Sequence, residues 1–286
     1  LEREVDVVNL PVAEKIKPGK ATVTLEMASG LKYRLDTLSS VVRNNRANVA
    51  FDNNGGILKV KEQDSAGNSL QETGCNTINV PYGGTYSVEL CDGTKVYLNS
   101  GTKLEFPSRF DGDVRSVSLK GEAYFDVTKS KEWPFIVRTC RSSVKVLGTS
   151  FNVCSYEEDA LEQVTLEQGG VEVKHHDETY LLHPGEQFEL DTTNEEVEVK
   201  PVNVKLYTSW IDGMFRFHNM PLDLLTVKLE RWYNVHFVFS NEVCKNYRFT
   251  GAIRKDVDFN EFIRLIERTT NVKFVINQKN IIIEEK

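Results

Sequence analysis

Between about residue 20 and residue 200, apolar and polar residues alternate with a period of two, and short turn sequences interrupt the alternation. This period is typical of half-buried β-strands, whose successive side chains point to opposite faces. ATVTLEM-SG-LKYRL predicts one hairpin and YSVEL-CDG-TKVYL a second, because Asp92-Gly93 suits a tight turn. Many short strands at this spacing indicate a sandwich, a roll or a meandering sheet. Residues 35–45 fit a helix and a strand equally well.

After residue 200 the pattern acquires the helical period. Leu222, Leu225, Leu229 and Trp232 share one helix face, and Pro221 suits the first turn. A second helical pattern places four further residues on one face, behind an Asp258/Glu261 capping box: Phe259, Phe262, Ile263 and Ile266.

The two helical segments belong to a sequence repeat. LERWYNVHFVF at 229–239 aligns with IERTTNVKFVI at 266–276, with six identities in eleven positions. Each predicted helix is followed by two predicted strands. The predicted fold is therefore mainly β, with an N-terminal multi-hairpin sandwich or roll over residues 1–205. Residues 206–286 are expected to form a small α+β domain of two αββ repeats, and residues 1–15 a linker.

Composition narrows the class of partner. The net charge of −7 is spread along the chain, which argues against nucleic acid and against an anionic membrane surface. No apolar run approaches the roughly 18–20 residues that cross a bilayer, so any membrane contact would need a span outside the chain. The start at LEREVDVV, without Met or signal peptide, indicates a trimmed portion of a longer protein.

The five cysteines are too few and too scattered for a disulfide scaffold, and we expect small, partly buried thiols. A bridge between Cys140 and Cys154 is the alternative in an oxidising compartment.

The stretch LKGEAYFDV at 119–127 contains the best candidate for a catalytic carboxylate pair, Glu122 and Asp126. The two acids are four positions apart, which corresponds to roughly 13 Å along a strand. Glycosidases need about 5–5.5 Å or 6.5–9.5 Å between such groups. The two acids therefore cannot cooperate, and we predict a framework role for them.

The HHDE stretch at 175–178 is the best candidate for a metal site. Adjacent ligands seldom converge on one ion without a distant third, so we predict a solvated hairpin turn, with His183 as a residue that could join in space. The sequence also lacks the nucleophile-elbow, zinc-protease, P-loop and dinucleotide-binding motifs. We accordingly expect no catalytic, cofactor-binding or metal-binding residues and no enzymatic activity.

In the C-terminal repeat, most aromatic residues are expected in the core, as for Trp232. Tyr233, Tyr247 and Arg248 lie off the apolar stripe or at strand starts, so we predict that they contact a protein partner. An exposed sheet edge of this unit would accept a partner strand through main-chain hydrogen bonds.

Several longer segments together carry a family resemblance: NVPYGGTYSVELCDGTKVYLNSGTKLEFPSRF (79–110), VSLKGEAYFDV (117–127), PFIVRT (134–139), VKVLGTSFNVCSY (144–156), LHPGEQ (182–187) and WIDGMFRFHNMPLDLLTVKLERWYNVHFVF (210–239). In this order, over about residues 15–286, they resemble the periplasmic part of a FecR-family transmembrane regulator. The C-terminal unit is similar to the short domain at the N-termini of secretins and TonB-dependent transporters.

The resemblance implies an anti-sigma regulator on the periplasmic face of the inner membrane. Its periplasmic part would receive a signal from the N-terminal signalling domain of a TonB-dependent outer-membrane transporter. It would control an extracytoplasmic-function sigma factor through a cytoplasmic segment and a single membrane span outside this chain. Two other classes stay open: a carbohydrate-binding β-sandwich module with exposed aromatics in residues 80–190, and a hydrolase with acids from neighbouring strands.

Overall fold

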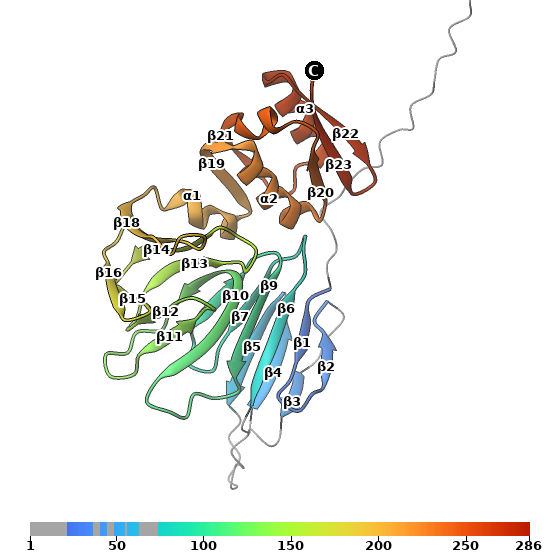
Figure 1. Cartoon of the computed structure of the whole chain (residues 1–286). Helices are drawn as coiled ribbons and strands as arrows, with labels where there is room; N and C mark the ends of the chain where they lie inside the picture. Colours follow the sequence, from blue (N-terminus) through green and yellow to red (C-terminus); the bar gives the residue numbers. More distant parts are fainter. Residues whose placement is uncertain (1–21, 37–40, 45–48, 55, 63–73) are drawn as a thin grey trace, which may run out of the picture.

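The computed structural model describes residues 22–36, 41–44, 49–54, 56–62 and 74–286. They form a β-rich body and a smaller C-terminal unit, which lies above one end of the body in Figure 1. Each part has a hydrophobic core of its own. The chain is mainly β with a small helix-containing C-terminal region, so the predicted fold class is confirmed.

The body is one large curled sheet whose two layers share a single long strand, β10 (Arg115–Asp126). The first layer has the order β2 (Lys32–Arg34), β1 (Thr24–Glu26), β6 (Cys75–Val80), β9 (Thr102–Pro107), β10, β11 (Phe135–Arg138), β12 (Ser143–Val146), β15 (Val171–His175) and β16 (Glu178–Leu182). The second has the order β3 (Val41–Asn44), β4 (Val49–Asn54), β5 (Ile57–Glu62), β7 (Tyr86–Glu89), β8 (Lys95–Leu98), β10, β13 (Ser150–Ser155), β14 (Leu161–Gln168), β17 (Glu186–Asp191) and β18 (Val197–Pro201). Both predicted hairpins, β1–β2 and β7–β8, are confirmed.

Strand β10 changes layer at Gly121. Residues before it pair with β9 and β11, and residues after it pair with β8 and β13. Gly121 has φ +108°, and a Cβ there would lie 2.7 Å from Thr102 Oγ1 and 2.8 Å from Thr102 Cα. The Thr102 hydroxyl donates to the Glu122 carbonyl and accepts from the Glu122 amide, both at 3.0 Å. Glycine is therefore required at this corner.

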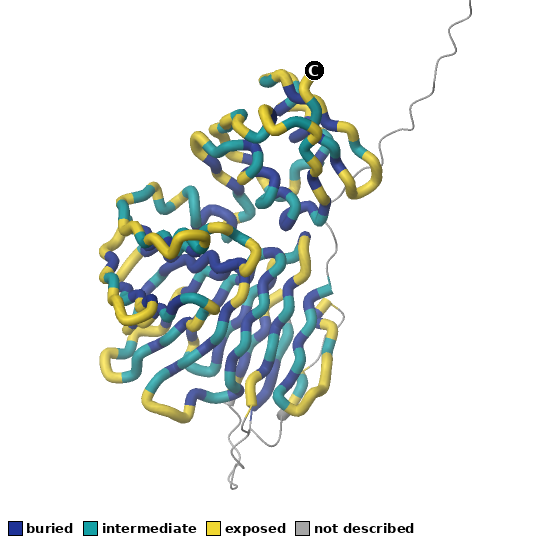
Figure 2. Tube along the Cα trace, viewed as in Figure 1, coloured by how far each residue is buried: buried dark blue, intermediate teal, exposed yellow. Residues whose placement is uncertain are grey.

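The two layers bury their facing side chains in one core. Burial alternates residue by residue, as in β9. The same alternation appears in Figure 2 as dark blue (buried) and teal (intermediate) segments along the strands of the body. Phe125 of the second layer packs against Phe135 of the first, with ring centroids 6.1 Å apart. A charged residue also lies at this core: Arg115, 1% exposed, donates to Asp92 at 2.7 Å and to the main-chain oxygens of Thr128 and Trp133.

The C-terminal unit follows a short connector formed by α1 (Lys205–Thr208) and η1 (Ser209–Asp212). Its elements are β19 (Met214–Pro221), α2 (Leu222–Tyr233), β20 (His236–Phe239), η2 (Glu242–Asn246), β21 (Arg248–Arg254), α3 (Phe259–Thr269), β22 (Val272–Asn277) and β23 (Asn280–Glu285). Strands β19 and β21 form a two-stranded ribbon, and β20, β23 and β22 form a three-stranded sheet. Every residue that the helical patterns assigned to the two inner faces is buried.

The sequence repeat recurs in the contacts of the two helices. Glu230 at the end of α2 accepts the amide of Phe237 at 2.6 Å, and Glu267 of α3 accepts the amide of Phe274 at 2.8 Å. Each helix is followed by two strands, as predicted. The strands do not pair only within each half, however: β20 pairs with β23 of the second half, and β21 pairs with β19, which precedes α2. The unit is therefore one interleaved domain rather than two separate repeats.

Some expectations fall partly outside the described residues. Of segment 35–45, residues 41–44 form β3, while residues 37–40 and 45 are outside the described part, as is the expected linker at 1–15. Cys140 and Cys154 are free thiols, so the alternative of a bridge between them is wrong. Cys75 and Cys140 are exposed, contrary to the expectation of partial burial. Among the described helices, none is long and apolar enough to cross a membrane.

Candidate functional site

A groove of about 750 Å³ lies between β21 and α3 of the C-terminal unit. Six consecutive residues of β21, from Phe249 to Arg254, line it. Because neighbouring strand residues point to opposite faces, a run of this kind means that the strand backbone itself borders the groove. Among the residues that the structure describes, β21 pairs only with β19, which leaves its second edge without a strand.

The groove has an apolar floor and a basic rim. Phe262 of α3 is buried in the floor, and Leu265 is 60% exposed beside it. Arg264 and Arg268 are exposed on the rim, and within the described part of the chain neither takes part in an ion pair. An apolar strand that carries acidic residues would match this combination of shape and charge.

The three residues predicted to contact a partner occupy different environments. Tyr233 is 2% exposed, with its ring against Phe259 and its hydroxyl donating to the Val257 carbonyl, so the expectation that it lies on the surface is wrong. Tyr247 is half-buried against the C-terminal core. Arg248 is exposed and donates to the Asn219 carbonyl. Tyr247 immediately precedes β21 and Arg248 begins it, and their role in partner binding stays a prediction.

A second notable region is the junction between the C-terminal unit and the body, which centres on Arg231 of α2. The Arg231 guanidinium donates to both carboxylate oxygens of Asp159 and to Glu158, and it lies 3.6 Å from the centroid of the Tyr156 ring. Burial alone would lower the pKa of Arg231, but the hydrogen bond and charge of Asp159 raise it above its usual value. The Arg231 carbonyl accepts the Gly83 amide at 2.7 Å.

Glu122 belongs to the same junction. Its carboxylate accepts from the Asn99 amide at 2.7 Å and from the Asn152 amide at 3.0 Å, and Asn152 accepts the indole N–H of Trp210 at 3.1 Å. Glu122, Asn99 and Trp210 border a cavity of about 40 Å³, which Lys228 also lines. Burial alone would lower the pKa of Lys228, but nearby negative charge, that of Glu122 above all, raises it. The prediction that Glu122 is framework omitted this contact with the C-terminal unit.

The carboxylates of LKGEAYFDV do not form a catalytic pair. The two oxygens of Glu122 are bound by two asparagine amides, whereas Asp126 is exposed and accepts from Ser150 at 3.1 Å. The aromatic platform expected of a sugar-binding module is also small. Among the described aromatic residues between 80 and 190, Tyr82 alone is exposed, with 38% of its surface accessible. Its hydroxyl donates to Glu158 beside the junction.

Comparison with known proteins agrees with the two-part architecture. Residues 76–172 match the family model described as FecR protein, and residues 214–283 match the model described as FecR, C-terminal. A crystal structure at 1.65 Å, described as a putative anti-sigma factor from Parabacteroides distasonis, is 34% identical to the chain. The match covers 73% of this chain and 99% of that one, with a TM-score of 0.69. The chain belongs to the FecR family.

A second crystal structure with the same description, at 2.50 Å, matches with the same identity and TM-score and covers 98% of that chain. None of the curated proteins matches. FecR-family anti-sigma factors are membrane-anchored regulators rather than enzymes, and they act through a sigma factor and regulatory partners. The functional surfaces of this FecR-family chain are therefore expected to bind proteins.

Sequence reasoning missed two of these features. The groove depends on the pairing of β21 with β19, which no local pattern indicates. Arg231 occupies the same repeat position as Arg268, yet one is buried at the junction and the other is exposed at the groove. The identity of the two residues in the aligned segments is a signal that both deserve comparison as arginines at equivalent positions of the two helices.

Proposed function

We propose that this chain is the periplasmic signal-receiving part of an anti-sigma regulator, and that the groove between β21 and α3 binds the signalling domain of a TonB-dependent outer-membrane transporter. The signal then controls an extracytoplasmic-function sigma factor through a cytoplasmic segment beyond a single membrane span. Membership of the FecR family supports the regulatory role. The observation that carries the site is the unpaired edge of β21 beside an apolar floor.

The repeat supports the chemistry of the partner. In the first half, Arg231 binds an acidic pair on the body and stacks on a tyrosine. In the second half, the equivalent Arg268 presents the same guanidinium to solvent beside the groove. The partner segment is therefore expected to be an extended strand with at least one carboxylate next to apolar residues.

Titration calorimetry with the isolated signalling domain tests the proposal. Leu265→Asp places a charge on the exposed edge of the floor and is expected to raise Kd by about 30-fold, the size of a 2 kcal/mol interface residue. Arg268→Glu reverses the charge on the rim. It is expected to raise Kd and to make Kd less dependent on salt concentration. Leu181→Asp is the matched control, because Leu181 is 65% exposed on β16 of the body.

No heat of binding at high micromolar concentrations of both folded proteins would exclude this partner. If Leu265→Asp changes Kd no more than Leu181→Asp does, the signalling domain remains a partner, but the groove is not its binding site.

A further inference from the structure

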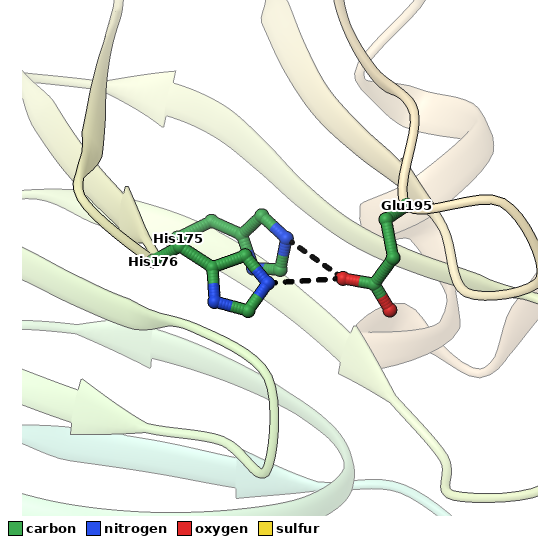
Figure 3. Close-up of side chains that lie close together, drawn as sticks. All are labelled: His175, His176 and Glu195. Atoms are coloured by element: carbon green, nitrogen blue, oxygen red, sulfur yellow. Dashed lines mark hydrogen bonds and ion pairs between the residues drawn. The ribbon is translucent and has the colours of Figure 1, made fainter.

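A cluster of two histidines and one glutamate joins two turns of the body. His175 ends β15, His176 opens the turn to β16, and Glu195 lies in the turn between β17 and β18 (Figure 3). Glu195 Oε2 is 3.2 Å from His175 Nε2 and 3.2 Å from His176 Nε2. The three possible ligand atoms all lie within 4.8 Å of one another. The turn was expected to be solvated, but His175 is only 6% exposed.

The backbone explains how adjacent histidines reach the same point. Successive side chains of an extended strand point to opposite faces. His176 instead has φ 50°, which brings its ring to within 4.1 Å of the His175 ring, centroid to centroid. Glu195 also has a positive φ, 61°. Two non-glycine residues of one cluster in this sparsely populated region are the kind of strain that accumulates at functional sites.

One ring nitrogen of His175 is bound outside the cluster, and the other is directed into it. His175 Nδ1 is 2.9 Å from the Arg141 carbonyl oxygen, and a carbonyl only accepts, so Nδ1 carries the proton. The other ring nitrogen, Nε2, faces Oε2 of Glu195 at 3.2 Å. His175 Nε2 is buried and has no hydrogen-bond partner among the described residues. A metal cation bound to both atoms would supply the partner that Nε2 lacks.

We propose that His175, His176 and Glu195 bind one divalent transition-metal cation, with Zn²⁺ as the representative. Zn–N and Zn–O bonds of about 2.0–2.2 Å in a tetrahedron separate ligand atoms by about 3.3 Å, which agrees with the two 3.2 Å distances. The carbonyl of Arg141 on Nδ1 is the outer partner that metal-bound histidines use. Imidazole ligands favour Zn²⁺, Cu²⁺ and Ni²⁺ over Mg²⁺ and Ca²⁺.

The surroundings give the ion an entry path and a structural effect. The side chains of His176 and Glu195 are 74% and 56% exposed, so a fourth ligand position opens to solvent. Strands β15 and β16 belong to the first layer of the sheet, and β17 and β18 to the second. The bound ion therefore cross-links the two layers at one end of the body, and it stabilises the folded state by mass action.

The test is titration of the chelator-stripped chain with Zn²⁺, followed by calorimetry and by thermal unfolding, in a Cys75→Ser/Cys140→Ser background that removes the exposed thiols. We expect one site per chain with a micromolar or lower Kd, and a higher Tm with Zn²⁺ but not with Mg²⁺. His176→Gln and Glu195→Gln are expected to raise Kd at least about tenfold, since even outer partners of ligands contribute that much.

The matched control is His183→Gln. His183 is 81% exposed and contacts a single carboxylate, Glu186, at 3.2 Å, so its removal is expected to leave Kd unchanged. Absence of Zn²⁺ binding up to millimolar concentration would overturn the proposal. Binding that His183→Gln abolishes, or that both His176→Gln and Glu195→Gln leave unchanged, would overturn it equally. The transporter-domain titration is independent of this outcome.

Discussion

Replacement of Arg231 by methionine tests whether one buried ion pair holds the C-terminal unit on the body. The Arg231 side chain is 8% exposed, whereas those of Asp159 and Glu158 are 21% and 57% exposed. Methionine keeps the apolar stem and removes the charge, which leaves Asp159 without its partner at the junction. Each part has its own hydrophobic core, so we expect separation of the two parts rather than unfolding of either.

The magnitude follows from the geometry of the pair. Removing one partner of a buried ion pair costs ~3–5 kcal/mol, and the partly exposed acids place this one at the lower end. A loss of about 3 kcal/mol changes the docking equilibrium about 150-fold, because each 1.4 kcal/mol is a factor of ten. The exposed repeat equivalent provides the matched control, Arg268→Met, which is expected to leave docking unchanged.

Hydrogen exchange at the Gly83 amide measures this equilibrium directly. That amide donates to the Arg231 carbonyl at 2.7 Å, a main-chain atom that the substitution retains. In Arg231→Met we expect exchange at Gly83 to accelerate by about two orders of magnitude, while core amides of the body keep their protection. Equal Gly83 protection in Arg231→Met and the wild type would refute the reasoning, as would simultaneous loss of protection in the body core.

Three further substitutions test the fold and its pH dependence. Gly121→Ala is expected to lower the free energy of unfolding by about 2–4 kcal/mol in urea denaturation, through backbone strain and overlap, whereas Gly112→Ala, with open space around it, changes it by less than about 0.5 kcal/mol. Arg115→Met is expected to cost ~3–5 kcal/mol in the same assay, since it leaves the Asp92 carboxylate buried and unpaired. Burial lowers the pKa of Lys255 to about 8 from 10.5, so the unfolded chain binds more protons between these values and stability rises with pH there. Lys255→Met should remove that rise in denaturation measured from pH 7.5 to 10.5; an unchanged pH profile would contradict the assignment.

Local periodicity was sufficient for the β1–β2 and β7–β8 hairpins, the two helices and their buried faces, but β19 before α2 was not predicted. Alternation in LKGEAYFDV correctly placed Phe125 in the core and Asp126 on the opposite face. The same alternation put Glu122 on the outer face of the sheet, and that too is correct. The sequence pattern does not show that a second unit covers this face, so the burial of Glu122 at the junction could not be predicted from it.

The groove and the histidine–glutamate cluster both depend on contacts between residues that are far apart in the sequence. The repeat in residues 229–276 predicted the order of elements, but not that β20 pairs with β23 and that β21 keeps a free edge. In the sequence, the HHDE turn has no nearby third ligand, because Glu195 lies 19 residues after His176 in another turn. Residue spacing along one strand or helix gives no information on such pairs. The curled sheet brings them together.

Hydrogen exchange of residues 249–254 during titration with the transporter signalling domain tests the proposed receiving site most directly. If the partner adds a strand to β21, amides of this segment that are not bonded to β19 gain protection, and Leu265→Asp shifts this gain to about 30-fold higher partner concentration. Binding that leaves residues 249–254 unprotected, or that protects only the strands of the body, would contradict the account.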